Sequence, residues 1–179
     1  MPRILSDESL DTLFRNASPQ PVWLDRPVGD TLLRALWELV RAGPAGDKSS
    51  SAQILFLRSD AAKERLAPAL PAEERADLPA APVIAVIASE GGGAVDCTEP
   101  RAPAARDGAL RGAYLTLAAR ALGLDCRPIW DFHAATIEAA FSPEGTGAVT
   151  FLCALGYGDE ARSEPPQPRR DPAEACRIL

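Results

Sequence analysis

The chain is poor in lysine, histidine and clustered cysteine, and each scarcity excludes a class of protein. Lys48 and Lys63 are its only lysines, one residue is histidine, and 25 acidic residues outnumber 19 basic ones, which gives a net charge of −6. Such a surface repels phosphate backbones and anionic lipid, so general nucleic-acid or membrane binding is not expected. The four cysteines form no Cys-x-x-Cys pair, so we expect no structural zinc and predict buried, reduced thiols instead.

Long hydrophobic runs are also missing. No segment approaches the ~20 apolar residues that cross a bilayer, and the first residues, MPRILSDESL, lack the apolar stretch of a secretion signal. We therefore expect a cytoplasmic protein. With 179 residues, 46% of them hydrophobic, residues 1–179 can form one domain with its own core.

Helical and strand patterns alternate along the chain. Helices are predicted over 6–16, 30–42, 60–70, 107–122 and 134–141, with Asp30 and Asp60 as N-caps of the second and third. Strands are predicted over 53–57, 83–88, 124–129 and 149–157. The run VIAVIA at 83–88 is apolar on both faces, as in an interior strand covered on both sides. The pattern predicts an α/β or α+β three-layer sandwich with helices on both faces of one sheet.

The remaining segments are predicted to be irregular. Proline marks a linker over 71–82, and glycine, proline and charge without periodicity indicate a loop over 89–106. The proline-rich tail, 163–179, is expected to be extended and to dock on a partner subunit. In the helix 107–122 one stripe is apolar and contains small residues suited to close packing: Leu110, Ala113, Tyr114, Leu117, Ala118 and Ala121.

Four segments resemble the nitroreductase family, and most closely its malonic semialdehyde reductase branch. These are WLDRPV (23–28) leading to Gly-Pro at 43–44, FLRS with AKERL (56–66), LRGAY with AARALGLDC (110–126), and FLCALGYGD (151–159) with EACRIL (174–179). The resemblance implies an α+β homodimer with a central, mainly antiparallel sheet and one FMN per active site at the dimer interface. It also implies hydride transfer from NAD(P)H through the flavin to a small acceptor such as a 3-oxo acid, an aldehyde or a nitro compound.

The resemblance assigns cofactor residues as well. Arg15, at the end of the first helix, and Arg169, in the tail, stand where the family places cations for the flavin phosphate. Each arginine is equally consistent with a solvated surface side chain. Asn16 can add a hydrogen bond to the phosphate or ribityl chain, or simply end its helix. The loop after the second helix supplies the other expected contacts: Lys48, Ser49, Ser51 and Gln53.

Two stretches depart from the family pattern. The family loop Gly-Pro-Thr-Ser-Ala-Asn-x-x-Pro reads GPAGDKSSS at 43–51, so that Lys48 replaces an amide. The family segment Gly-Pro-Met-Ser-Gly-Phe reads RPIWDF at 127–132, where Pro128, Ile129 and Trp130 are the expected flavin contacts. Glycine permits close approach of the backbone, so bulk here opposes the flavin, and Trp130 either stacks on the ring or fills its place.

Further departures keep other interpretations open. The loop 89–106 replaces a helical excursion that covers the partner's active site and selects the substrate in the family. A flavin-less homologue would keep the dimer and act as a binding or regulatory protein. A different enzyme would have to use Arg127, Asp131 and His133. His133 itself is more simply a surface or cap-adjacent residue than a general acid.

Overall fold

A four-stranded antiparallel sheet forms the centre of the molecule. The computed structural model describes residues 4–17, 22–43, 52–89, 103–141, 148–162, 171–176 and 178. The strands are β1 (Ala52–Leu57), β2 (Val83–Ser89), β3 (Asp125–Ile129) and β4 (Ala148–Gly156), in the order β1-β2-β4-β3. Each strand is antiparallel to its neighbours. The four strand predictions are confirmed to within one residue at each end, and the α+β class is confirmed.

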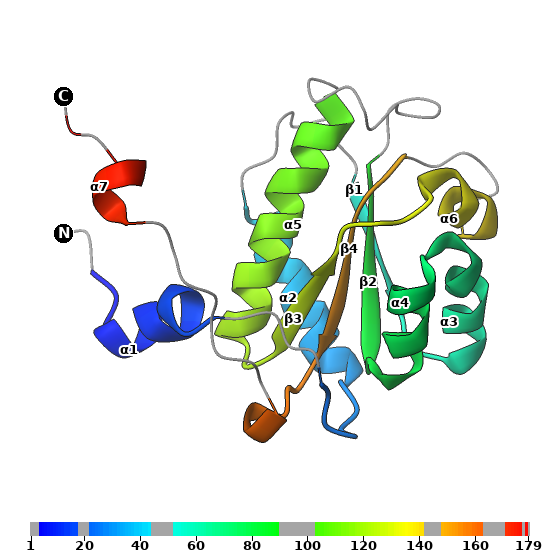
Figure 1. Cartoon of the computed structure of the whole chain (residues 1–179), viewed down its shortest axis with the longest axis horizontal. Coiled ribbons are helices and arrows are strands. Elements are labelled where there is room, and N and C mark those ends of the chain that lie inside the picture. The colour runs from blue at the N-terminus through cyan, green and yellow to red at the C-terminus, as the bar shows by residue number, and fades with distance from the viewer. Residues whose placement is uncertain are drawn as a thin grey trace.

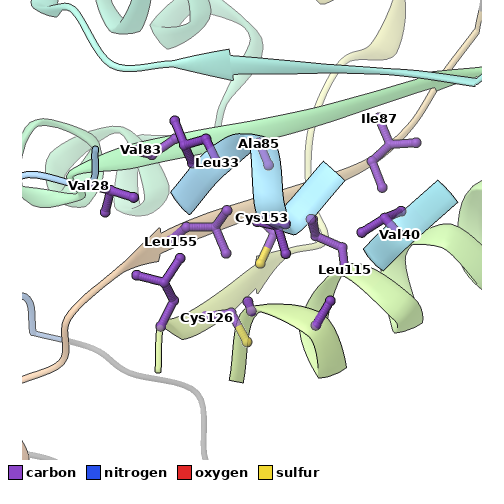
Figure 2. Packing of buried hydrophobic residues seen from close by; sticks show 14 of the residues in the cluster. Val28, Leu33, Val40, Val83, Ala85, Ile87, Leu115, Cys126, Cys153 and Leu155 are labelled. Carbon is purple, nitrogen blue, oxygen red and sulfur yellow. The ribbon is translucent and has the colours of Figure 1, made fainter. Parts of the chain in front are cut away.

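Helices cover both faces of the sheet (Figure 1). On one face lie α2 (Asp30–Arg41) and α5 (Pro103–Ala121), and on the other lie α3 (Asp60–Leu66), α4 (Ala72–Asp77) and α6 (Ala134–Phe141). The interior strand β2 shows why both faces must be covered. Val83, Ala85 and Ile87 point into the cluster beneath α2 and α5, which Figure 2 shows, while the intervening residues point into the other cluster. Every β2 side chain from 83 to 88 is buried.

Two buried thiols belong to the core on the α2–α5 face. Cys126 and Cys153 are 1% and 0% exposed, and both labelled side chains lie in the packed cluster of Figure 2. A hydrogen bond with Cys126, together with burial, raises the pKa of Cys153 well above its ordinary value. These two cysteines are buried free thiols, as the sequence predicts, whereas Cys176 is exposed and Cys97 lies outside the described residues.

Both ends of the described chain lie apart from the sheet, at the left of Figure 1. The predicted first helix is divided into α1 (Asp7–Leu10) and a π-helical turn, η1 (Asp11–Arg15), neither of which contains a buried residue. Its predicted cap is confirmed, because the Ser6 hydroxyl accepts a 3.2 Å hydrogen bond from the Ser9 amide. The tail is not extended throughout, since α7 (Pro172–Ala175) is a short helix.

Several predicted boundaries were wrong by a residue or more. Gly29, not Asp30, caps α2, and Asp30 instead pairs with Arg58 at 2.7 Å. Ser59, not Asp60, caps α3, because its hydroxyl accepts a hydrogen bond from the amide of Ala62, the third residue of the helix. The linker 71–82 contains α4, whose sequence AEERAD is rich in strong helix formers, and α5 begins at 103 inside the predicted loop. Within the described ranges, no helix is both long and apolar enough to cross a membrane.

Candidate functional site

A largely apolar pocket of about 430 Å³ lies between α5 and the strands β3 and β4. We call it the α5–β3 pocket. Its volume falls within the range of roughly 300–1,000 Å³ that is usual for small-molecule sites. Two of its residues, Pro128 and Trp130, come from the segment predicted to contact a flavin. The complete lining is Ala109, Gly112, Ala113, Thr116, Leu117, Pro128, Trp130, Thr150 and Phe151.

Small residues on α5 set the shape of the pocket. A Cβ atom on Gly112 would lie 2.7 Å from the ring of Phe151, and one on Gly108 would lie 2.0 Å from the Thr150 hydroxyl. The helix therefore lies directly against β4, and glycine is needed for that approach. The predicted close packing of α5 is present, but it uses these glycines, and neither was in the predicted stripe.

The predicted apolar stripe of α5 faces mostly outward. Leu115, Ala118 and Ala119 are buried against the sheet, whereas Leu110 and Tyr114 are 42% and 38% exposed. Of the predicted stripe, Ala118 alone is fully in the core. The prediction failed because a stripe of apolar residues shows that a helix face is covered by something, not which face meets the sheet.

Trp130 follows the last residue of β3 and forms one wall of the pocket. Its side chain is 75% exposed, and its ring meets that of Phe151 edge to face, with centroids 6.0 Å apart and planes at 84°. Such an arrangement is favourable for aromatic pairs. The indole therefore lines the pocket from the end of β3.

The polar side chains that line the pocket are those of Thr116 and Thr150, and each hydroxyl already donates a hydrogen bond to a backbone carbonyl. Thr116 Oγ1 donates to the Gly112 carbonyl at 3.0 Å, and Thr150 Oγ1 donates to the Ile87 carbonyl at 3.3 Å. Each hydroxyl oxygen can still accept a hydrogen bond. Within the described part of the chain, no charged side chain lines this pocket. Its walls therefore suit a flat, apolar group with an N–H donor at its edge.

The bulky residue Arg127 does not enter the pocket. Its guanidinium donates to Asp77 at 3.0 Å and lies 3.4 Å from Glu74, both on α4 at the other face of the sheet. Ile129 also points to that face, where it is 2% exposed in the second core cluster. Replacing glycine by Arg127 thus adds an anchor for β3 to α4 and not bulk in the pocket.

The other predicted groups after β3 have structural roles or face solvent. Asp131 is exposed. His133 immediately precedes α6, where its carbonyl accepts hydrogen bonds from the amides of Thr136 and Ile137 and its own amide donates to the Ala69 carbonyl. Its interpretation as an exposed, cap-adjacent residue agrees with this geometry.

The described residues predicted to hold the phosphate, Arg15 and Asn16, do not line the pocket. Arg15 lies on η1, exposed, and donates to Asp11 at 2.6 Å and Asp7 at 3.0 Å. Its pKa is raised by these two carboxylates, Asp11 first. Asn16 is the exposed C-cap of the same turn. Lys48, Ser49, Ser51 and Arg169 lie outside the described residues.

Gln53 and Pro128 lie on opposite edges of the sheet. Gln53 is exposed on β1 and Pro128 lines the pocket from β3, and three strand spacings separate these edges, or about 14 Å. One chain therefore does not bring the two predicted flavin contacts together.

The described residues fit the ring system of FMN better than they fit its phosphate. The α5–β3 pocket fits a planar ring system, with an aromatic wall at Trp130 and acceptors at Thr116 and Thr150. For the phosphate, Arg15 is the one described residue among the predicted cations, and two carboxylates already pair with it.

Sequence reasoning missed four residues that shape the pocket: Gly112, Thr116, Thr150 and Phe151. A glycine pair four residues apart, at 108 and 112, was the available signal for close packing of a helix on the sheet. Nothing in the sequence alone pointed to the two threonines, because their roles depend on pairing between α5 and β4.

Comparison with known proteins decides the family. A protein of Ralstonia nicotianae named "Putative NADH dehydrogenase/NAD(P)H nitroreductase" is 38% identical over 192 aligned positions, which cover 98% of each chain. A protein of Stenotrophomonas maltophilia with the same name is 40% identical over 199 positions, covering 99% of this chain and all of that one. The chain belongs to the nitroreductase family. Because these alignments exceed 179 positions, the relatives carry residues that this nitroreductase-family chain lacks.

Solved structures agree on the fold. A Bacillus subtilis protein described as a "putative nitroreductase" has a TM-score of 0.82 at 15% identity, covering 97% of this chain and 100% of that one. Another, from Exiguobacterium sibiricum and described in complex with FMN, has a TM-score of 0.80 at 14% identity and covers both chains fully. At such identities the likeness shows the nitroreductase fold alone. No protein-family model matches the chain.

Proposed function

We propose that this protein is an FMN-dependent oxidoreductase of the nitroreductase type. It would pass hydride from NAD(P)H to a small acceptor such as a 3-oxo acid, an aldehyde or a nitro compound. The open α5–β3 pocket beside Pro128 and Trp130 is the observation that carries this proposal. The full-length relatives named as NAD(P)H nitroreductases, and the fold neighbour in complex with FMN, support it.

When bound, the flavin supplies the hydride chemistry, and the protein has to hold and orient it. Trp130 and the small residues of α5 would bind the ring system, and the oxygens of Thr116 and Thr150 would accept hydrogen bonds from its edge. Arg15 and Arg169 would bind the phosphate. Apolar walls would exclude water from the reacting face.

The active unit would be a homodimer. Gln53 and Pro128 lie on opposite edges of the sheet in one chain, and in a dimer the β1 edge of a second chain would lie beside the pocket of the first. Leu110 and Tyr114 form an exposed apolar face on α5 that a second copy would cover. The tail 163–179 would dock on that partner. The cytoplasm, where thiols such as Cys126 stay reduced, is the compartment we propose.

A flavin-less binding or regulatory protein is the second candidate, and the ion pairs of Arg15 favour it. A phosphate would have to compete with the carboxylates of Asp7 and Asp11, which lie 3.0 Å and 2.6 Å from the guanidinium. The same dimer and pocket would then bind another ligand.

Absorbance of the purified protein tests the two candidates. The first expects a flavin band, or its recovery after FMN is added, and bleaching of that band by NADH without oxygen. Arg15→Ala combined with Arg169→Ala should weaken retention of FMN. Arg41→Ala is the matched control, because Arg41 is also an exposed helical arginine paired with a carboxylate. Colourless protein that does not take up FMN would support the second candidate.

A further inference from the structure

We propose that Trp130 recognises the ring of the ligand in the α5–β3 pocket by stacking, so that affinity comes from the ring system more than from a phosphate. The nature of the ligand rests on the proposed function, but the role of Trp130 does not require that FMN be the flavin bound. This role belongs to the present chain, since the segment it resembles has serine at that position.

The indole of Trp130 has a large exposed surface and one aromatic contact with the packed core. With 75% of Trp130 exposed, most of its surface is open to a partner. Its ring is held by the edge-to-face contact with Phe151, which is itself only 7% exposed. Phe151 in turn sits against Gly112, where α5 leaves no room for a Cβ atom. One edge of the indole therefore rests on a packed side chain, and contacts that restrict a side chain before binding lower the entropic cost of binding.

The remaining walls match a flat heteroaromatic ring. Ala109, Ala113 and Leu117 present small or apolar side chains from α5. The hydroxyl protons of Thr116 and Thr150 are donated to backbone carbonyls, so their oxygens are left to accept. A ring with an edge N–H group would satisfy them without breaking an existing bond. An aromatic stack and such acceptors together select a planar ring that carries a donor.

Three flavin probes separate ring recognition from phosphate recognition. Lumiflavin contains the isoalloxazine ring with only a methyl group on N10, riboflavin has the ribityl chain instead, and FMN adds the phosphate. Each would be titrated into the full-length protein, after removal of any bound flavin, and followed by quenching of the probe's own fluorescence. The variants are Trp130→Ser, Trp130→Phe and the control Trp37→Phe, because Trp37 lines other pockets, beside β1.

We expect Trp130→Ser to weaken all three probes by about tenfold or more, since stacking on an aromatic side chain contributes that much to binding a base. Trp130→Phe should retain affinity to within about threefold, and Trp37→Phe should change nothing. Because Trp130 is exposed, its variants should keep the thermal transition of the parent protein.

Four results would overturn the proposal. These are unchanged affinity in Trp130→Ser, tighter binding in that variant because the indole obstructs the pocket, no binding of any probe to the parent protein, and a change of oligomeric state that accounts for the loss. If binding of lumiflavin depends on Trp130 but FMN binds no tighter than riboflavin, the stacking role stands and the FMN assignment fails. If FMN binds equally tightly to the parent protein and to Trp130→Ser, the FMN assignment stands and the stacking role fails.

Discussion

The contact between α5 and β4 at Gly108 offers the sharpest test of how this fold is packed. A Cβ atom on Gly108 would lie 2.0 Å from Thr150 Oγ1 and 2.2 Å from Thr150 Cβ. Rotation of the Thr150 side chain relieves only the first clash, because its Cβ is fixed by the strand. Gly108→Ala must therefore move the helix away from the sheet.

Two opposing effects set the magnitude. Replacing glycine by alanine inside a helix stabilises the helix by about 1 kcal/mol. Overpacking a close contact costs about 1–3 kcal/mol, and a contact this short belongs at the upper end. We therefore expect a net loss of about 2 kcal/mol, which corresponds to a fall of about 4–8 °C in Tm for a domain of this size.

Thermal unfolding followed by circular dichroism, with urea unfolding as a second measure, gives the comparison. The control is Ala109→Gly, which changes the neighbouring exposed residue and should cost only about 1 kcal/mol through helix propensity. If propensity governed both positions, Gly108→Ala would raise Tm while Ala109→Gly lowered it. A rise in Tm for Gly108→Ala would refute the close packing of α5 on β4.

Three more outcomes follow from the structure. Ser59→Ala should cost about 1 kcal/mol in urea unfolding because it removes the α3 cap, and Asp60→Ala should cost less; the opposite order would restore the predicted cap. Burial lowers the pKa of Lys63 in the folded protein, so the unfolded chain binds more protons than the folded one below the ordinary lysine pKa of 10.5. The free energy of unfolding of the parent protein should therefore rise relative to that of Lys63→Met as the pH increases from neutral toward 10.5, and a constant difference between the two would contradict this. Leu110→Arg places a charge on the exposed face of α5 that a second copy is proposed to cover, so it should shift the sedimentation of the protein toward the monomer. A variant that sediments as an unchanged dimer would show that this face of α5 is not part of the interface.

The strands were predictable because their signal is local. The run from Val83 to Ala88 is apolar on both faces, and only an interior strand between two helical layers can bury it. Helix ends were less predictable, since Ser59 and Asp60 are both good caps and tertiary contacts decide between them. Asp30 shows this effect of tertiary contacts more clearly, because its carboxylate forms an ion pair with Arg58, a residue 28 positions later in the chain, and does not cap the helix.

Single residues of the candidate site were predictable from the sequence, but their arrangement in space was not. Trp130 and Pro128 do line the pocket, since a residue at the end of an edge strand meets whatever packs beside that strand. The orientation of Arg127 was not predictable, because alternation along β3 sends it to the face opposite Pro128, where α4 supplies the carboxylates. That helix was itself hidden in a segment predicted to be a linker.

The sheet topology links the two parts of the proposed function, ligand binding and formation of a homodimer. In the order β1-β2-β4-β3 the edges of the sheet are β1, with Gln53, and β3, with Pro128 before Trp130. In the proposed homodimer, β1 of one chain would lie beside β3 of the other, so that both segments contact one ligand and a complete site requires association. Ligand affinity should then fall as the dimer dissociates on dilution, in step with the sedimentation profile. Affinity that stays constant through dissociation would mean that the α5–β3 pocket of a single chain is the whole site, and Gln53 would then have no part in it.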